Sequence, residues 1–219
     1  MFVLLPHYYS KARSLKLIIS YTFHGIKWTQ NDDVLLLSMG SYNEIRQKYR
    51  PNHIQVLLIA ESPPPAAGVA SSRHFYRSDQ IRREDRLFAN TVRALYPEAE
   101  QVPEPELEHA KEQWLRKFQA DGWYMIEALE KSMPHEATKQ QRQAFIKENL
   151  PQLLEHVTGL TNKNTKIILI KSNVFDVAAE PLRQAGFTVL NTELIDYPGR
   201  FNQSAYRQKL SKLAAQANQ

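Results

Sequence analysis

Four short apolar runs, spaced along the chain from residue 55 onward, constrain the fold more than any other feature of the sequence. They span residues 55–60, 123–129, 166–170 and 187–191. Each has the length of a strand and little polar alternation, which is typical of strands buried on both faces. Segments with helical spacing separate the runs, so we expect parallel strands joined by helical crossovers. The sequence therefore predicts an α/β fold, a three-layer α/β/α domain with a four-stranded parallel sheet.

Helical spacing of apolar residues occurs between the runs and after the last one. The predicted helices cover residues 81–95, 107–120, 138–157, 174–185 and 203–217. Pro151 is expected to bend or divide the third helix, because proline lacks the amide hydrogen that a helix interior needs. Gly186 follows the fourth helix, where a left-handed cap is expected. The acidic stretch 98–105 contains proline and is interpreted as a surface linker.

The first 50 residues differ from the rest and are treated as an N-terminal extension, with the α/β/α domain covering residues 51–219. Apolar runs at residues 15–23 and 33–39 would form a hairpin or edge strands, or belong to a poorly ordered segment. Residues 41–49 are predicted to form a short helix that ends before Pro51. The sequence assigns no role to this extension.

The composition narrows the classes of function. The 219 residues include no cysteine, which excludes disulfides, cysteine–zinc sites, iron–sulfur clusters and thiol nucleophiles. The net charge of +5 favours phosphate-bearing partners slightly. No apolar run approaches the roughly 20 residues of a membrane helix, and the first residues make a poor signal peptide. A cytoplasmic, monomeric protein without metal or other cofactor is therefore expected.

Several common catalytic motifs are absent from the sequence. The seven histidines include no close pair with metal-ligand spacing. There is also no phosphate-binding glycine loop, no G-x-G-x-x-G motif and no G-x-S-x-G elbow. Metal hydrolases, nucleoside triphosphatases, dinucleotide enzymes and serine hydrolases are therefore disfavoured.

Ligands of open parallel sheets bind beyond the carboxyl ends of the strands. Here these ends are followed by residues 61–77, 127–134, 171–173 and 192–200. The first segment opens with Glu61 and Ser62 before consecutive prolines, which would hold the carboxylate on a rigid turn. Around Phe75, aromatic and basic residues from Arg73 to Arg77 interleave, as in proteins that stack bases and contact phosphates. Alternatively, Phe75 closes the top of the core and the arginines are solvated.

The other strand ends carry further candidate side chains. Glu127 lies within an apolar run, so it is expected to be ion-paired or functional, because an unpaired buried carboxylate is costly. Lys171 follows the third strand, where it contacts a ligand or merely extends its amine to solvent. Tyr197 and Arg200 flank a Pro-Gly turn whose amides would face an anion, unless this is an ordinary loop before a helix.

Together these segments resemble the motifs of the uracil-DNA glycosylase superfamily. The family motif after the first strand reads G-E-A-P-G in the most similar branch, and this chain has Ala60-Glu61-Ser62-Pro63-Pro64 there. The V-x-L-G-A-x-A motif of the third strand corresponds to residues 168–174, and the H-P-S motif to Tyr197-Pro198-Gly199. The base-reading asparagine after the second strand corresponds to Glu127, and the base-stacking aromatic residue to Phe75. The resemblance implies a four-stranded parallel α/β/α fold and a DNA partner whose base flips into the strand-end cleft.

The resemblance covers about residues 52–217, and the sequence departs from the family pattern at several places. Ser62 stands where the family commonly has its water-activating Asp or Asn. Tyr197 replaces the leaving-group histidine, and Glu127 replaces the base-reading amide. The iron–sulfur cysteines of the most similar branch are absent. The family fold is expected, whereas activity on uracil in DNA is expected to be weak or absent.

The residue at the base-reading position indicates a different specificity. Uracil presents an N–H donor beside a carbonyl acceptor, which an amide side chain matches. An ionised Glu127 only accepts hydrogen bonds and would suit two adjacent donors, as on the N1–H and N2–H₂ edge of guanine. A neutral Glu127 would donate once and accept once, but only if burial raises its pKa.

Three functions follow as hypotheses. The first is a uracil-DNA glycosylase-like enzyme, a DNA base-excision glycosylase with altered base specificity. The second is a nucleic-acid or nucleotide-binding module on the same fold without glycosylase activity. The third is a different small-molecule hydrolase that uses the same cleft.

Under the glycosylase hypothesis, each candidate residue has a role. Glu61 would activate or orient the water, while Tyr197 and Arg200 would stabilise the departing base. The remaining substrate contacts would come from Ser62, Phe75, Glu127 and Lys171. Basic side chains of the first loop and the following helix would contact single- or double-stranded DNA through its phosphates: Arg73, Arg77, Arg82 and Arg83.

Overall fold

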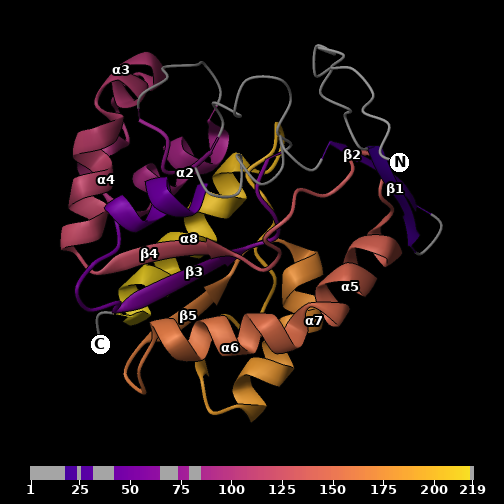
Figure 1. Cartoon of the computed structure of the whole chain (residues 1–219). Coiled ribbons are helices and arrows are strands. Elements are labelled where there is room, and N and C mark those ends of the chain that lie inside the picture. The colour runs from indigo at the N-terminus through magenta and orange to yellow at the C-terminus, as the bar shows by residue number, and fades with distance from the viewer. Residues whose placement is uncertain (1–17, 24–25, 32–41, 65–73, 79–84, 218–219) are drawn as a thin grey trace, which may run out of the picture.

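Four parallel strands form the centre of the structure, a computed structural model that describes residues 18–23, 26–31, 42–64, 74–78 and 85–217. The sheet has the strand order β4-β3-β5-β6 (Figure 1). Its strands are β3 (Val56–Ala60), β4 (Trp123–Glu127), β5 (Lys166–Leu169) and β6 (Thr188–Val189). All three pairings are parallel, so the predicted α/β class and parallel core are confirmed.

The register of the sheet brings the segments after the strands to one edge. Ala60 of the central strand β3 pairs with Glu127 at the end of β4, and Ile59 pairs with Leu169 at the end of β5. The amide of Lys171 donates a hydrogen bond of 2.6 Å to the carbonyl of Ile195, which fastens the segment after β6 to the same edge. The described residues that directly follow the strands therefore lie along one edge of the sheet, as the sequence predicted.

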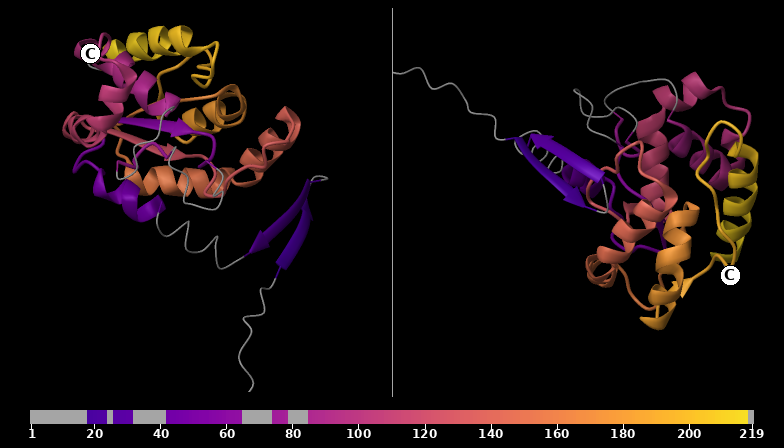
Figure 2. Two further views of the ribbon diagram at one scale, coloured as in Figure 1. Left: turned by 90° about the horizontal axis from the view of Figure 1, so that it is seen from above. Right: turned by 90° about the vertical axis from the view of Figure 1, so that its right-hand side faces the viewer.

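Helices cover both faces of the sheet (Figures 1 and 2). One face carries α2 (Arg86–Leu95), α3 (Glu104–His109), α4 (Lys111–Ala120) and α8 (Gln203–Ala217), with the short 3-10 helix η1 (Pro97–Ala99) between α2 and α3. The opposite face carries α5 (Lys139–Glu148), α6 (Leu150–Leu160) and α7 (Ser172–Gln184). This arrangement is consistent with three α/β/α layers. No helix among the described residues is long and apolar enough to cross a membrane.

The helix boundaries differ from the predicted ones for local reasons. Helix α2 begins after Asp85, whose carboxylate accepts the amide of Phe88 at 3.1 Å; residues 81–84 of the predicted helix lie outside the described residues. The predicted helix 107–120 is divided at Ala110, and α3 begins within the stretch interpreted as a linker. The predicted division at Pro151 is confirmed: proline stands in the first turn of α6, where its missing amide costs no helical hydrogen bond.

The N-terminal part contains a hairpin and a helix with different surroundings. Strands β1 (Ile18–Phe23) and β2 (Ile26–Asn31) pair antiparallel and stand apart from the α/β/α layers in Figure 2. The predicted run at 33–39 lies outside the described residues. Residues 42–48 are helical, and the following Tyr49 is fully buried in the main core. The packed domain therefore includes residues that the sequence analysis assigned to the extension.

Two glycines without neighbours at the Cβ position provide a matched test of the predicted cap. Gly186 follows α7 at φ +89°, whereas Gly159 lies in α6, and nothing lies within 4 Å of a Cβ built on either residue. Gly186→Ala should lower the free energy of unfolding by about 1 kcal/mol, because a side chain disfavours the left-handed backbone. Gly159→Ala should raise it by up to about 1 kcal/mol, because alanine favours helix. Urea unfolding measures both, and changes of the same sign would contradict the assignment.

Candidate functional site

Glu61 directly follows β3 and is the centre of a buried polar cluster. One carboxylate oxygen accepts a hydrogen bond from Asn173 Nδ2 at 2.6 Å. The other forms ion pairs with Arg142 Nη1 at 2.9 Å and with Lys171 Nζ. Both oxygens are engaged by these three side chains, which leaves little acceptor capacity for the water that Glu61 was predicted to activate or orient. The carboxylate instead links β3 to α5 and to the start of α7.

Arg142 connects this cluster to the loop between β4 and α5. Its guanidinium donates hydrogen bonds to the carbonyls of Pro134 and Ala137 at 2.9 Å each, and to that of His135 at 3.3 Å. The loop is therefore fixed to the same carboxylate as the end of β3. Arg142, 81 residues from Glu61, has no local motif around it, whereas Asn173, 112 residues away, lies within the third-strand motif but was given no role.

Lys171 has an unusual backbone. Its φ of +82° is the only positive φ of a non-glycine residue in the described part of the chain. A left-handed conformation costs an L-residue about 1–2 kcal/mol, and such strain persists only where surrounding contacts enforce it. Here the amide bonds to Ile195 and the amine pairs with Glu61, while the side chain stays 30% exposed. Lys171 thus lies at the sheet edge, as the sequence predicted, with its amine directed toward Glu61.

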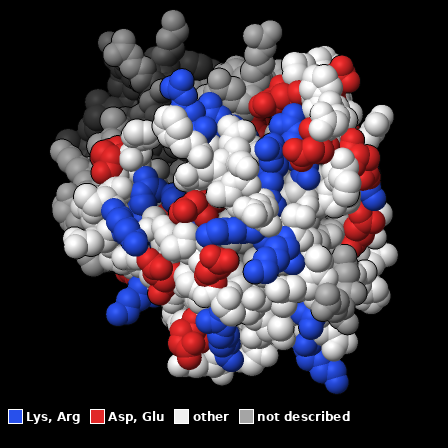
Figure 3. Space-filling view, turned by 180° about the vertical axis from the view of Figure 1, so that it is seen from behind, with Lys and Arg blue, Asp and Glu red and all other residues white. Residues whose placement is uncertain are grey.

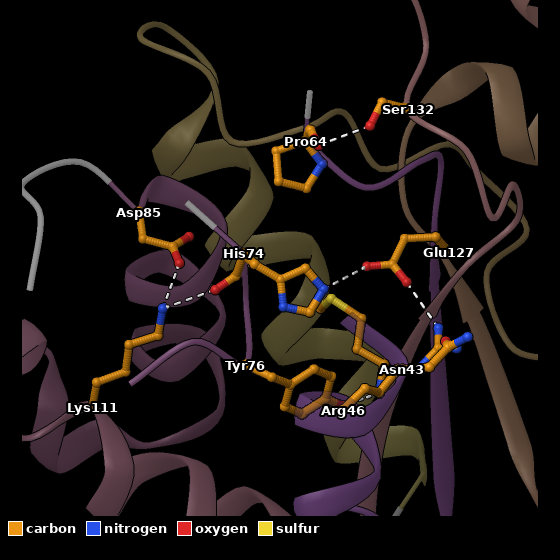
Figure 4. A network of polar contacts seen from close by, with 10 residues as sticks. Asn43, Arg46, Pro64, His74, Tyr76, Asp85, Lys111, Glu127 and Ser132 are labelled. Atoms are coloured by element: carbon orange, nitrogen blue, oxygen red, sulfur yellow. Dashed lines mark hydrogen bonds and ion pairs between the residues drawn. The ribbon is translucent and has the colours of Figure 1, made fainter. Parts of the chain in front are cut away.

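Glu127 ends β4 and forms a second polar cluster (Figure 4). One oxygen lies 2.9 Å from Arg46 Nη1, and the other lies 3.6 Å from His74 Nε2. The side chains of Arg46 and Glu127 are only 10% and 12% exposed. The guanidinium also donates a hydrogen bond of 2.6 Å to Asn43 Oδ1. Of the two alternatives weighed for Glu127, the ion pair is present.

The surroundings of Glu127 decide its charge. Burial is the largest single influence and raises its pKa, but the polar contact with His74 and the charges of His74 and Arg46 together outweigh it. The net pKa is lower than that of an ordinary glutamate. Glu127 is therefore a carboxylate at neutral pH and accepts hydrogen bonds without donating any.

The segment that carries His74 is firmly anchored. The carbonyl of His74 accepts a hydrogen bond of 3.1 Å from Lys111 Nζ, which also pairs with Asp85 at 2.7 Å (Figure 4). The hydroxyl of Tyr76 accepts the amide of Met125 on β4 at 2.6 Å. These contacts hold the His74 ring, which is stacked on Tyr42 with centroids 4.6 Å apart, beside Glu127.

Phe75 does not occupy the position predicted for it. Its side chain is 3% exposed and lies in the core, with ring centroids 5.4 Å from Phe118 and 5.9 Å from Phe88. The ring is thus enclosed by other aromatic residues and has no free face on which a base can stack. The alternative, in which Phe75 closes the top of the core, describes the structure.

A small pocket opens beside Glu127 at the sheet edge. Its enclosed part measures about 20 Å³, room for about one small chemical group. The described residues that line it are Tyr42, Asn43, Arg46, Pro63, His74, Glu127, Leu129, Glu130 and His156. Burial lowers the pKa of His156 most, and Arg46 lowers it further, while Glu130 and Glu127 oppose this shift. The pocket therefore combines acceptors, a permanent cation and an imidazole whose neutral form is favoured.

The remaining predicted residues lie outside this pocket. Ser62 is half-buried beside Glu61, and Arg77 closes a turn through its amide, which donates to the carbonyl of His74 at 2.9 Å. Tyr197 and Arg200 are exposed on the segment before α8. The other predicted phosphate contacts lie outside the described residues: Arg73, Arg82 and Arg83. Among the described residues, no three His, Asp or Glu side chains gather as a metal site requires.

The pocket residues that did not emerge from the sequence analysis include Arg46, His74 and His156. Arg46 lies 81 residues before its partner Glu127, in the segment treated as an extension. His74 directly precedes Phe75, and its place within the aromatic and basic segment was the one available signal. His156 lies on α6 and has no motif around it.

Replacing Lys171 separates its backbone strain from its charge. Lys171→Gly and Lys171→Ala both remove the amine, but only glycine adopts φ +82° without penalty. The glycine variant should be more stable than the alanine variant by about 1 kcal/mol in urea unfolding. The exposed helical residue Gln184 is the control: there, the glycine variant should be less stable than the alanine variant. If the free energy of unfolding of Lys171→Ala equals or exceeds that of Lys171→Gly, the backbone of Lys171 is not strained.

His156 should make stability depend on pH. Because its folded pKa lies below the value of 6.5 for an unperturbed histidine, the unfolded chain binds the proton more readily. The free energy of unfolding should therefore fall as the pH drops from about 7.5 to about 5.5, and His156→Gln should reduce this loss. His53→Gln, at an exposed histidine, is the matched control and should leave the loss unchanged. Identical pH profiles for the wild type and His156→Gln would refute this prediction.

Comparison with known proteins adds no identification. No protein family, curated protein or solved structure matches the chain. The functional interpretation of the two carboxylate clusters therefore depends on their geometry and chemistry.

Proposed function

We propose that this chain is a uracil-DNA glycosylase-like protein, a DNA base-excision glycosylase with altered base specificity that presents a flipped base to the pocket beside Glu127. One observation carries the proposal. Glu127, which the resemblance aligns with the base-reading residue, ends β4 and lines a pocket at the carboxyl edge of the sheet. This is where open parallel sheets bind their ligands.

The backbone of Lys171 supports the same alignment. The family motif has a glycine where this chain has Lys171, and Lys171 has the left-handed φ that glycine adopts readily. Glu61 and Glu127, aligned with two other family motifs, lie at the same sheet edge. A backbone feature and two side-chain positions thus agree with the resemblance, although the side chains differ from those of the family.

The segment before α8 offers groups that suit DNA. Phe201 is 90% exposed, and the guanidinium carbon of Arg200 lies 5.7 Å from the centre of its ring. An exposed apolar side chain can insert between base steps, and an arginine can contact a phosphate. Tyr197 and Arg200 could also donate hydrogen bonds to the departing base, where electrostatic stabilisation contributes most. In this proposal, Tyr197 and Arg200 take the role that the leaving-group histidine has in the family.

The face of the molecule seen from behind carries both basic and acidic side chains. Seen from behind, basic and acidic side chains are interspersed (Figure 3). Ion pairs on α8 show the same mixture, with Lys209 Nζ 3.3 Å from Glu193 and Arg207 Nη2 3.9 Å from Glu100. Although the net charge is +5, the face that Figure 3 shows has no uniformly basic surface to which a phosphate backbone would bind.

A second candidate, a nucleic-acid-binding module without excision activity, is favoured by one specific observation. Both oxygens of Glu61 are engaged by Arg142, Lys171 and Asn173. Under the glycosylase proposal the water would need activation by another group, whereas a binding module needs none. Direct measurement of base release separates the two candidates.

The test uses oligonucleotides that each carry one uracil, hypoxanthine or guanine in a thymine tract, as single strands and as duplexes. Alkaline cleavage after incubation reveals abasic sites. The wild type should release guanine and leave uracil and hypoxanthine, which each present one N–H beside a carbonyl, largely intact. Phe201→Ala should lower both binding and release about tenfold, consistent with about 1–3 kcal/mol for contact of an aromatic residue with a base. Phe201→Leu, which keeps an apolar wedge, is the matched control.

Each outcome has a defined meaning. Salt-dependent binding without abasic sites would support the binding module and exclude the glycosylase. Robust release of uracil would contradict the altered specificity. Absence of binding to every probe at low salt would exclude both candidates.

A further inference from the structure

The contact between Arg46 and Glu127 joins two distant parts of the chain inside the pocket. Arg46 belongs to the helical residues 42–48, outside the strands and crossover helices of the sheet. Its Nη1 lies 2.9 Å from Glu127, and its Nη2 is held at 2.6 Å by Asn43. Both members of the ion pair are about nine-tenths buried, so water screens the interaction only weakly. The N-terminal helix therefore supplies a fixed charge to the residue proposed to contact the base.

We propose that Arg46 determines the base specificity of this pocket by holding Glu127 as a pure acceptor, so that the pocket selects a base edge with two adjacent donors. The N1–H and N2–H₂ edge of guanine and of its modified forms has this chemistry. The inference rests on the proposed function, because it assigns a ligand class to the same pocket. Arg46 acts through Glu127 and is a specificity-determining residue.

The charge of Glu127 depends on the groups around its carboxylate. Several titratable or charged groups surround it: Arg46, His74, Tyr76, Tyr124, His156 and, near His156, Glu130 and Arg50. Of these groups, His74 lies 3.6 Å from the carboxylate, beyond ordinary hydrogen-bond length, and its contact and charge lower the pKa of Glu127 more than the charge of Arg46 does. Arg46 is in direct contact and charged at every relevant pH. Without Arg46, the contact and charge of His74 and a backbone hydrogen bond would remain to oppose burial, so the pKa of Glu127 should rise toward the neutral acid.

A ligand also needs free acceptor capacity on Glu127. A carboxylate offers about four acceptor positions, of which Arg46 uses one, while His74 faces the other oxygen at 3.6 Å. Acceptor capacity therefore remains for a ligand. Since the enclosed pocket has a volume of about 20 Å³, the edge of a base fits there and the whole ring does not. Two adjacent N–H groups match such an edge, whereas the carbonyl beside the N–H of uracil would face a negative oxygen.

Removing the cation should change the protonation of Glu127. In Arg46→Met, the pKa of Glu127 should rise although His74 still opposes the change, and the protonated side chain would donate once and accept once, as an amide does. Such a group matches uracil. The variant should therefore bind uracil in preference to guanine, and this preference should become stronger as the pH falls.

The experiment measures fluorescence anisotropy of labelled thymine tracts that contain one guanine, one uracil or neither. The wild type and Arg46→Lys should prefer the guanine probe. Arg46→Met should lose this preference by about tenfold or more, consistent with about 1–3 kcal/mol for a paired base edge. Its binding of the uracil probe should strengthen as the pH falls, which a merely structural role for Arg46 would not produce.

Two further variants keep the proposal falsifiable if Arg46→Met does not fold. Glu127→Gln carries an amide in place of the carboxylate and should prefer uracil at every pH. Asn43→Ala, at an exposed residue, loosens Arg46 without removing its charge and should weaken the guanine preference partially. An unchanged preference in Glu127→Gln, in a protein that binds the probes, would overturn the inference alone. If the wild type distinguishes no probe from the plain thymine tract, the inference fails; if it also binds no DNA at low salt, the proposed function fails with it.

Discussion

Two carboxylates, Glu61 and Glu127, are buried at the carboxyl edge of an otherwise apolar sheet, and the rest of the site is organised around them. A buried charge is tolerated only where partners replace its hydration. Glu61 has two cations and an amide, and Glu127 has a guanidinium and an imidazole. Removal of one partner of a buried pair typically costs about 3–5 kcal/mol, because an uncompensated charge remains. The clusters therefore determine which segments must meet at this edge.

The partners come from elements that are far apart along the chain. Arg46 lies on the helix before the sheet, Arg142 on α5, and Asn173 in the first turn of α7. Each ties its element to the end of β3 or β4. The strained backbone of Lys171 fits the same requirement, because this residue holds the segment after β6 through its amide and Glu61 through its amine. A glycine there would relieve the strain but would supply no charge.

The two clusters also differ in what they leave available to a ligand. The oxygens of Glu61 are occupied by three side chains, whereas Glu127 has weaker contact on its His74 side and lines a pocket. Glu61 is therefore best described as a structural anchor, and Glu127 as the carboxylate that we propose contacts a ligand. This division moves the proposed chemistry away from the loop that the sequence analysis emphasised and toward the end of β4.

The fold class followed from the sequence, because apolar runs of strand length and helical spacing are local patterns. They predicted β3, β4, β5, the divided helix at Pro151 and the cap at Gly186. The candidate site was predicted in part: Glu61, Glu127 and Lys171 were expected at the strand ends, since each directly ends or closely follows an apolar run. The sequence alone thus determined the strands and which carboxylates lie at their ends. Only the tertiary structure decided that Phe75 is enclosed in the core, that Arg46 and Arg142 pair with the two carboxylates, and that His74 and Asn173 contact them. The physical reason is that the charge and access of a buried group depend on partners brought together from distant segments.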